Sequence, residues 1–104
     1  MVKTIMVDID DTICYYNENV SQGDYSKAKP YYDRISKINS LYDEGHTIIY
    51  WTARGTMSNI NWFKITQEQL TSWECKYHEL RMNKPAYDLF IDDKNVESKT
   101  YFNS

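Results

Sequence analysis

Short apolar runs alternate with longer polar or amphipathic stretches along the 104 residues of the chain. Most of these runs are rich in β-branched or aromatic residues and are too short for a helix, which is typical of buried strands. We therefore predict four strands, at residues 3–8, 47–51, 76–80 and 87–91.

Two of the stretches between these runs carry helical signals. Apolar residues recur at helical spacing after Pro30, a residue that suits the first turn of a helix, and predict a helix over residues 30–44. Thr66 and Gln69 form a capping-box pattern, in which two side chains satisfy free N–H groups at a helix start. This pattern predicts a second helix at about residues 67–74.

The order of these elements defines the expected fold. Strands and helices that alternate along a chain favour an α/β fold with a mainly parallel sheet of about four strands. Right-handed crossovers place the second and third strands on one side of the first, and the fourth can take the other side. We expect one domain over residues 1–104, with the polar residues 13–29 forming a flap-like loop or small hairpin over the first strand's end.

Side chains capable of chemistry follow the predicted strands at their carboxyl ends, the edge at which open α/β sheets bind ligands. Each of them alone has an ordinary explanation as a turn, a cap or a solvated residue. Together they would supply the carboxylates, the cation and the hydrogen-bond donors that phosphoryl transfer needs, with magnesium as a metal that prefers oxygen ligands. The group comprises Asp8, Asp10, Thr52, Lys84, Asp92 and Asp93.

The order of these residues resembles the four motifs of the haloacid dehalogenase (HAD) superfamily of aspartate-nucleophile phosphatases. The first motif, DxDxT, corresponds to residues 8–12, and the second, an apolar strand ending in Thr or Ser, ends at Thr52. Lys84 matches the basic third motif, and the acidic pair at 92–93 matches the fourth. The resemblance implies a three-layer Rossmann-like core and a magnesium-dependent phosphomonoesterase that works through an aspartyl-phosphate intermediate.

The same resemblance implies a catalytic or phosphate-binding role for five residues. Asp8 would attack phosphorus, and Asp10 would protonate the leaving alcohol and then deprotonate the hydrolytic water. Thr52 and the backbone N–H of Ala53 would hold the phosphoryl oxygens. Lys84 would neutralise the nucleophile and the phosphate.

A magnesium site is also implied by the resemblance. Its ligands would be the carboxylate of Asp8, the backbone carbonyl of Asp10 and the carboxylate of Asp92, while Asp93 would orient the waters around the metal. Which residue of the acidic pair binds the metal directly stays open. Arg54 either touches the substrate phosphate or forms a structural ion pair, and the sequence favours neither.

The lengths between the motifs leave no room for an inserted cap domain. About 40 residues separate Thr12 from Thr52, and about 32 separate Thr52 from Lys84. The chain therefore resembles capless family members, which commonly use large substrates or form homo-oligomers in which a neighbouring subunit acts as a lid. The site would be open unless residues 14–29 or another subunit covers it. Residues 48–55 and 89–95 are similar to small capless members associated with surface-polysaccharide synthesis, which suggests a phosphorylated sugar or polyol as substrate.

Charge and composition limit the partners that we expect. A formal net charge of −3 and a pI near 5.3 argue against a broad nucleic-acid-binding face. No run approaches the roughly 20 apolar residues of a membrane span, and no basic, apolar signal precedes the first strand, so we expect a soluble, cytoplasmic protein. Cys14 and Cys75 lack the spacing of zinc or redox sites and are predicted to be inert thiols.

Two alternative functions remain open at this point. A response-regulator receiver domain also combines acids, a Thr or Ser and a Lys at one sheet edge, but its phosphoacceptor aspartate falls between the acidic cluster and the Thr. No acid ends the second strand here, where Tyr50, Trp51 and Thr52 stand. A catalytically silent HAD-like interaction module would have no need of both Asp8 and Asp10. The order of the motifs favours the phosphatase.

Overall fold

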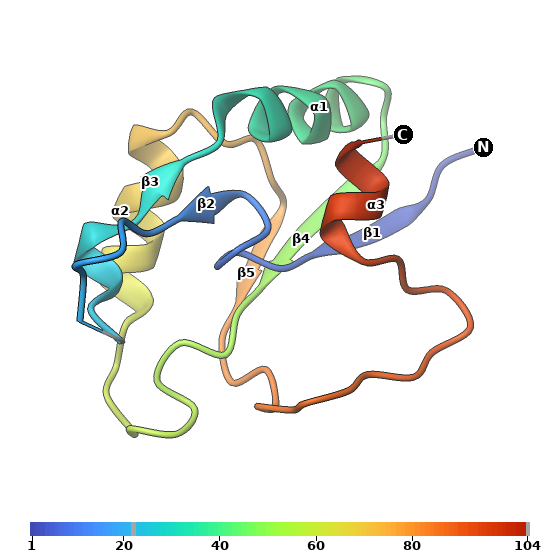
Figure 1. Ribbon diagram of the computed structural model, residues 1–104. Coiled ribbons are helices and arrows are strands. Elements are labelled where there is room, and N and C mark those ends of the chain that lie inside the picture. Colours follow the sequence, from blue (N-terminus) through green and yellow to red (C-terminus); the bar gives the residue numbers. More distant parts are fainter. Residues whose placement is uncertain (22, 104) are drawn as a thin grey trace.

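A three-stranded parallel sheet forms the centre of the computed structural model, which describes residues 1–21 and 23–103 (Figure 1). Its strands are β1 (Thr4–Val7), β4 (Thr47–Trp51) and β5 (Glu79–Arg81), in the order β1-β4-β5. The prediction of an α/β fold whose second and third strands lie in succession on one side of the first is confirmed. The third of these strands begins later than expected.

One face of the sheet packs against helices α1 (Tyr32–Asp43) and α2 (Phe63–Ser72). The ladders pair Val7 with Tyr50 and Tyr50 with Leu80, so these side chains share this face. The hydrophobic effect of burying them together with the helices' apolar residues stabilises the layer. The buried core contains Val7, Ile9, Ile13, Ile35, Ile38, Ile48, Tyr50, Leu70 and Trp73.

The opposite face of the sheet is only partly covered. Met6 of β1 pairs with Ile49 of β4 on this face and remains 44% exposed. The short helix α3 (Ser98–Phe102) packs against the same core as α1, and Lys37 Nζ donates a hydrogen bond to the carbonyl of Tyr101 at 3.2 Å. Helices α1, α2 and α3 thus pack around one core. The three-layer arrangement that the resemblance implies is not complete, because the face that carries Met6 is only partly covered.

The predicted flap contains a small hairpin. Strand β2 (Cys14–Tyr15) pairs antiparallel with β3 (Lys29–Pro30), and a 3₁₀ turn, η1 (Tyr25–Lys27), lies between them. Of the two expectations for this stretch, a loop or a small hairpin, the described residues form the hairpin; residue 22 lies outside them. The predicted helix start at Pro30 was wrong, because this residue belongs to the hairpin, whose short ladder tolerates a missing N–H. Helix α1 begins at Tyr32.

The predicted capping box was also wrong. Helix α2 begins at Phe63, so Thr66 lies inside the helix and is completely buried. Its hydroxyl accepts a hydrogen bond from Arg54 Nη1 at 3.0 Å, and the side-chain carbonyl of Gln69 accepts another from the same nitrogen at 2.6 Å. The pair that resembled a helix cap therefore serves a buried arginine.

The segment predicted as a fourth strand, residues 87–91, has no strand in this structure. After β5 the chain runs in an open arc before it returns at α3 (Figure 1, orange to red). Leu89 and Ile91 are 76% and 88% exposed. An apolar run becomes a strand only where a ladder partner accepts its backbone groups, and periodicity alone does not specify that partner.

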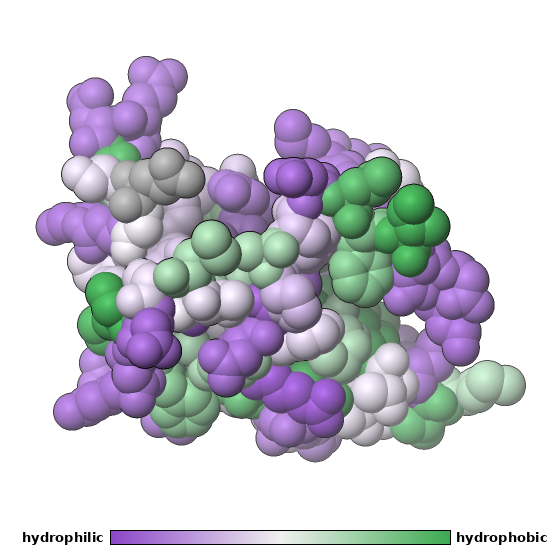
Figure 2. Space-filling view, turned by 90° about the horizontal axis from the view of Figure 1, so that it is seen from below, coloured by the Kyte–Doolittle hydropathy of each residue, from purple (hydrophilic) through white to green (hydrophobic). Residues whose placement is uncertain are grey.

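Hydrophobic residues gather at one side of the molecule in the view from below (Figure 2). The exposed apolar residues of the arc are Tyr87, Leu89, Phe90, Ile91 and Val96. Among the described residues, no helix is both long enough and apolar enough to cross a membrane.

Candidate functional site

The turn that follows β1 presents two carboxylates on either side of a buried residue. Ile9 is completely buried, while Asp8 and Asp10 are partly exposed. The carbonyl of Ile9 accepts hydrogen bonds from the N–H groups of Thr12 and Ile13 at 3.1 and 2.9 Å, which closes the turn. The core thus anchors the middle of the motif and leaves its acids at the carboxyl end of the sheet.

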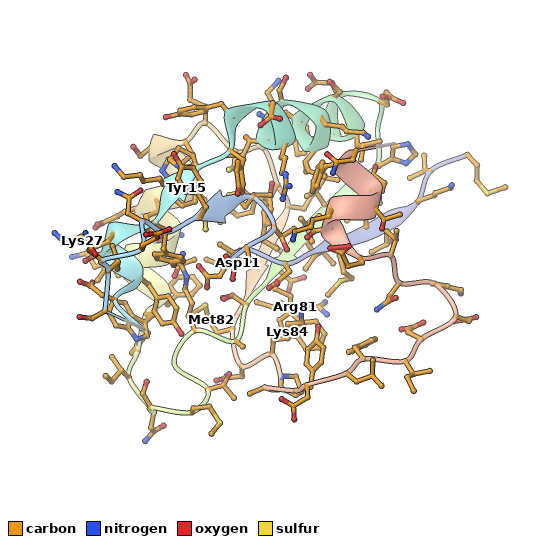
Figure 3. The ribbon with its side chains drawn as sticks, viewed as in Figure 1. Asp11, Tyr15, Lys27, Arg81, Met82 and Lys84 are labelled. Atoms are coloured by element: carbon orange, nitrogen blue, oxygen red, sulfur yellow. The ribbon has the colours of Figure 1, made fainter. Side chains whose placement is uncertain are left out.

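Lys84 is the cation beside the first of these acids. Its Nζ lies 3.6 Å from Oδ1 of Asp8, and the lysine side chain is only 13% exposed. The backbone positions it, because the N–H of Lys84 donates to the carbonyl of Thr52 at 3.0 Å and its own carbonyl accepts from Thr56 Oγ1 at 2.9 Å. Figure 3 places Lys84 and Asp11 at the same end of the sheet.

The environment of Asp8 favours a neighbouring positive charge. Burial raises the pKa of the Asp8 carboxyl group, and the coulombic attraction of Lys84 opposes that rise. The hydroxyl of Thr12 donates to Oδ2 of Asp8 at 3.4 Å. Any further cation at this carboxylate would stabilise its charged form in the same way.

The second predicted motif lies in the turn that follows β4. Thr52 is 1% exposed, its N–H donates to the carbonyl of Arg81 at 3.0 Å, and its Oγ1 accepts from the N–H of Arg54 at 3.1 Å. The hydroxyl of Thr52 is the acceptor in this bond, so the bond does not use the hydroxyl proton. The carbonyl of the next residue, Ala53, accepts from the N–H of Thr56 at 3.0 Å.

Arg54 forms a buried ion pair with Asp10. Its guanidinium is completely buried, and Nη2 lies 2.9 Å from Oδ1 of Asp10, whose side chain is 23% exposed. Nε donates to both carboxylate oxygens, at 3.3 and 3.1 Å. Nη1 donates to Thr66 and Gln69, and Nη2 also donates to the hydroxyl of Tyr16 at 3.4 Å. Of the two roles left open for Arg54, this geometry is that of the ion pair.

Tyr16 is a further partner of Asp10 that the sequence did not indicate. Its hydroxyl donates to Oδ1 of Asp10 at 2.5 Å. Burial and the adjacent carboxylate raise the pKa of Tyr16, so the hydroxyl remains a donor at neutral pH. The flap also contributes Tyr25, whose ring centroid lies 5.0 Å from Cζ of Arg54 and whose carbonyl accepts from Gln69 Nε2 at 2.7 Å.

No local signal distinguishes the residues that sequence reasoning missed. Tyr16 is one of ten tyrosines, while Thr66 and Gln69 were interpreted as a helix cap. All three accept hydrogen bonds from the guanidinium of Arg54, and they do so only because the fold brings the flap and helix α2 to the turn after β4.

The acidic pair Asp92 and Asp93 makes no contact with Asp8, Asp10 or Lys84 among the described interactions. Both Asp92 and Asp93 are exposed, and the carboxylate of Asp92 accepts from the backbone N–H of Lys94 at 2.9 Å, which lowers its pKa. Among the described residues, no three His, Cys, Asp or Glu side chains are grouped so that they could hold a metal ion. Metal binding by Asp92 therefore stays a prediction.

The donor chemistry at the end of β1 nevertheless fits magnesium. The ion prefers oxygen ligands and commonly takes one or two carboxylates, with waters and substrate phosphate completing its shell. Asp8 provides a partly buried carboxylate, 38% exposed at its side chain, which a cation would help to keep ionised. The backbone carbonyl of Asp10 belongs to the same turn.

Comparison with known proteins identifies a shared fold. Searches found no matching protein-family model and no match among curated proteins. The crystal structure of a structural-genomics target from Vibrio cholerae superimposes with a TM-score of 0.83 at 27% sequence identity, covering 100% of this chain and 89% of the other. The α/β architecture, from β1 to α3, therefore corresponds to an experimentally observed fold.

Proposed function

We propose that the protein is a magnesium-dependent phosphomonoesterase with a capless, HAD-type core, acting through an aspartyl-phosphate intermediate. The observation that carries this proposal is the pairing of Asp8 with Lys84 at 3.6 Å, at the carboxyl end of a parallel sheet and beside Asp10. A small phosphorylated metabolite such as a sugar or polyol phosphate, acted on in the cytoplasm, is the substrate that we propose.

The reaction would proceed in two displacements. In the first, a carboxylate oxygen of Asp8 bonds to phosphorus as the bond to the leaving oxygen breaks, and Asp10 gives its proton to that oxygen. In the second, Asp10 takes a proton from water, which attacks phosphorus and releases inorganic phosphate and free Asp8. Asp10 would thus act first as an acid and then as a base.

Three groups would hold the phosphoryl oxygens during these steps. The hydroxyl of Thr52 retains its proton for donation, and the backbone N–H of Ala53 follows directly after it. Lys84 supplies a positive charge that is already oriented by its own backbone hydrogen bonds. Fixed donors that need not reorganise stabilise the developing charge effectively.

The proposed metal would supply positive charge to the phosphoryl oxygens when bound. Asp8, the carbonyl of Asp10 and Asp92 would hold it, with Asp93 orienting its waters. Strand β1 lies at the edge of the sheet, so its outer side can accept another strand. We propose that residues 87–91 pair with this side of β1 and so bring Asp92 to the metal site. Hydrogen exchange tests this step: added magnesium should slow amide exchange in residues 87–91, and unchanged exchange would argue against the fourth strand.

A cover over the site is also part of the proposal. The flap is already joined to the site through the hydrogen bond of Tyr16 to Asp10 and the contact of Tyr25 with Arg54. A neighbouring subunit in a homo-oligomer could complete the cover, and sedimentation at several concentrations would measure whether one forms.

Magnesium-dependent hydrolysis of p-nitrophenyl phosphate is the direct test. Wild-type protein should turn over this ester, and either Asp8→Asn or a chelator should abolish the activity. Asp43→Asn is the matched control, because this carboxylate is exposed on α1 and, among the described residues, pairs only with Lys76. If correctly folded wild-type protein with magnesium hydrolyses no ester in a broad panel of phosphates, the phosphatase proposal fails.

A catalytically silent interaction module is the second candidate. The exposed apolar residues of the arc, among them Leu89 and Ile91, and the exposure of Asp92 favour it. Absence of turnover in the panel above, together with a partner whose binding is lost in Leu89→Ser, would support this candidate instead.

A further inference from the structure

Arg54 lies at the candidate site but offers no contact to the substrate. We infer that Arg54 is a positioning residue that sets the carboxylate of Asp10 for proton transfer; this inference depends on the proposed phosphatase function. Its side chain is 0% exposed, and the N–H donors of its guanidinium are directed at acceptors within the protein. Any effect of Arg54 on the reaction must therefore act through its neighbours.

The hydrogen bonds of Arg54 leave no donor for a substrate. A guanidinium has five N–H donors in a rigid plane. Nε is directed at Asp10, Nη1 at Thr66 and Gln69, and Nη2 at Asp10 and Tyr16. Because every donor has an acceptor within the protein, the plane of the guanidinium is held in one orientation.

That fixed plane in turn fixes the carboxylate of Asp10. Oδ1 accepts from Nη2 of Arg54 at 2.9 Å and from the hydroxyl of Tyr16 at 2.5 Å. The thiol of Cys14 lies 3.5 Å from the same oxygen. Among the described residues, Oδ2 has a single hydrogen-bond partner, Nε of Arg54 at 3.1 Å. Oδ2 is consequently the oxygen with capacity left to carry the transferred proton.

The chemistry of the step explains why a cation belongs here. As the phosphate ester bond breaks, the O–H bond at Oδ2 of Asp10 breaks and a new O–H bond forms on the leaving oxygen. Asp10 is left with a negative charge, which the guanidinium at 2.9–3.3 Å compensates. The inference thus gives Arg54 a role in leaving-group protonation, distinct from the role of Lys84 at the nucleophile.

A comparison of two leaving groups separates positioning from a purely structural role. Nitrophenolate departs without a proton, whereas the alkoxide of an alkyl ester such as glycerol phosphate needs one. For Arg54→Met we expect kcat on glycerol phosphate to fall by about 100-fold or more, and kcat on p-nitrophenyl phosphate by less than about 10-fold. Arg81→Met is the control, because Arg81 is an exposed arginine whose side chain pairs with Glu79 at the surface, and it should leave both rates unchanged.

A double variant tests whether Arg54 acts through Asp10. In Asp10→Asn, the carboxyl proton is absent, so adding Arg54→Met should cause little further loss on glycerol phosphate. Multiplied losses in the double variant would overturn the inference. Equal losses on both esters in Arg54→Met would overturn it too, since impaired folding lowers every rate alike.

Arg54→Lys serves where Arg54→Met does not fold. It keeps a buried cation but lacks the planar fork, so the same preference for the aryl ester is expected in weaker form. An equal loss on both esters in this variant would overturn the inference. Wild-type protein without turnover on any ester removes the proposed function itself, whereas active wild-type protein with no leaving-group preference in the variants removes only the role of Arg54.

Discussion

The Nζ atom of Lys84 lies 3.6 Å from Oδ1 of Asp8, joining the segment after the last strand to the turn after the first. Parallel strands bring these segments to one edge of the sheet, and the hydrogen bond from the N–H of Lys84 to the carbonyl of Thr52 holds the lysine there. The desolvated carboxylate of Asp8 thereby gains a compensating charge.

Replacement of Lys84 by methionine should reduce phosphatase activity strongly. The variant keeps much of the side-chain volume but removes the charge that faces Asp8 and the phosphate. We expect kcat/KM on p-nitrophenyl phosphate to fall by about 100-fold, similar to the loss of one oxyanion donor. Lys76→Met, which removes an exposed lysine from a surface pair with Asp43, is the control. Full activity of Lys84→Met would contradict the assigned role.

Removal of Arg54 should cost considerable stability. Arg54→Met leaves the carboxylate of Asp10 without its buried partner, and breaking such a pair typically costs about 3–5 kcal/mol. Urea unfolding followed by circular dichroism would measure the loss. In an Asp10→Asn background the same substitution should cost less, because no buried charge is left unpaired. Additive losses in this cycle would show that the two residues are not energetically coupled.

Gly55 should resist substitution because its backbone approaches another segment closely. Its φ is +82°, and an added Cβ would lie 2.1 Å from the carbonyl oxygen of Ile60. In Gly55→Ala, the free energy of unfolding should therefore fall by about 1–3 kcal/mol beyond the cost of placing alanine at a positive φ. Gly45→Ala is the matched control, since Gly45 has a φ of +99° and nothing within 4 Å of its would-be Cβ. Equal melting temperatures for the two variants would contradict this prediction.

The two thiols should react slowly with alkylating reagents in the folded protein. Burial raises the pKa of Cys75 to about 12, and burial together with Asp10 raises that of Cys14. At pH 8 we expect modification at least about 100-fold slower than for a free cysteine with a pKa of about 8.5. The rate should rise with pH and on unfolding. Rapid modification of the folded protein at pH 8 would contradict the prediction.

The same shift predicts a change in stability with pH. A folded chain that retains thiol protons binds more protons than its unfolded form between about pH 8.5 and pH 12. This contribution to the free energy of unfolding is therefore constant below that window and falls as pH rises through it. Urea unfolding of wild type and Cys75→Ala at pH 8 and pH 10 would measure this contribution. An equal loss of unfolding free energy between the two pH values in both proteins would contradict the prediction.

Local patterns in the sequence determined the first two strands of the sheet and part of the candidate site. The apolar runs around Val7 and Tyr50 form strands because the hydrophobic effect of burying one continuous face stabilises them. The polar residues that follow must leave the core. That constraint places Asp8, Thr52 and Lys84 at one edge, as predicted. Composition likewise predicted a loop or a small hairpin in the flap, and the pairing of β2 with β3 decides for the hairpin.

Tertiary structure decided what depends on contacts between distant segments. Thr66 and Gln69 satisfy a helix-cap pattern as well as they satisfy Arg54, and only the packing of α2 against the turn after β4 selects the second use. The partnership of Tyr16 with Asp10 has the same origin. Residues 87–91 have a strand-like sequence but no ladder partner in this structure, because strand pairing requires a neighbour that the run itself does not encode.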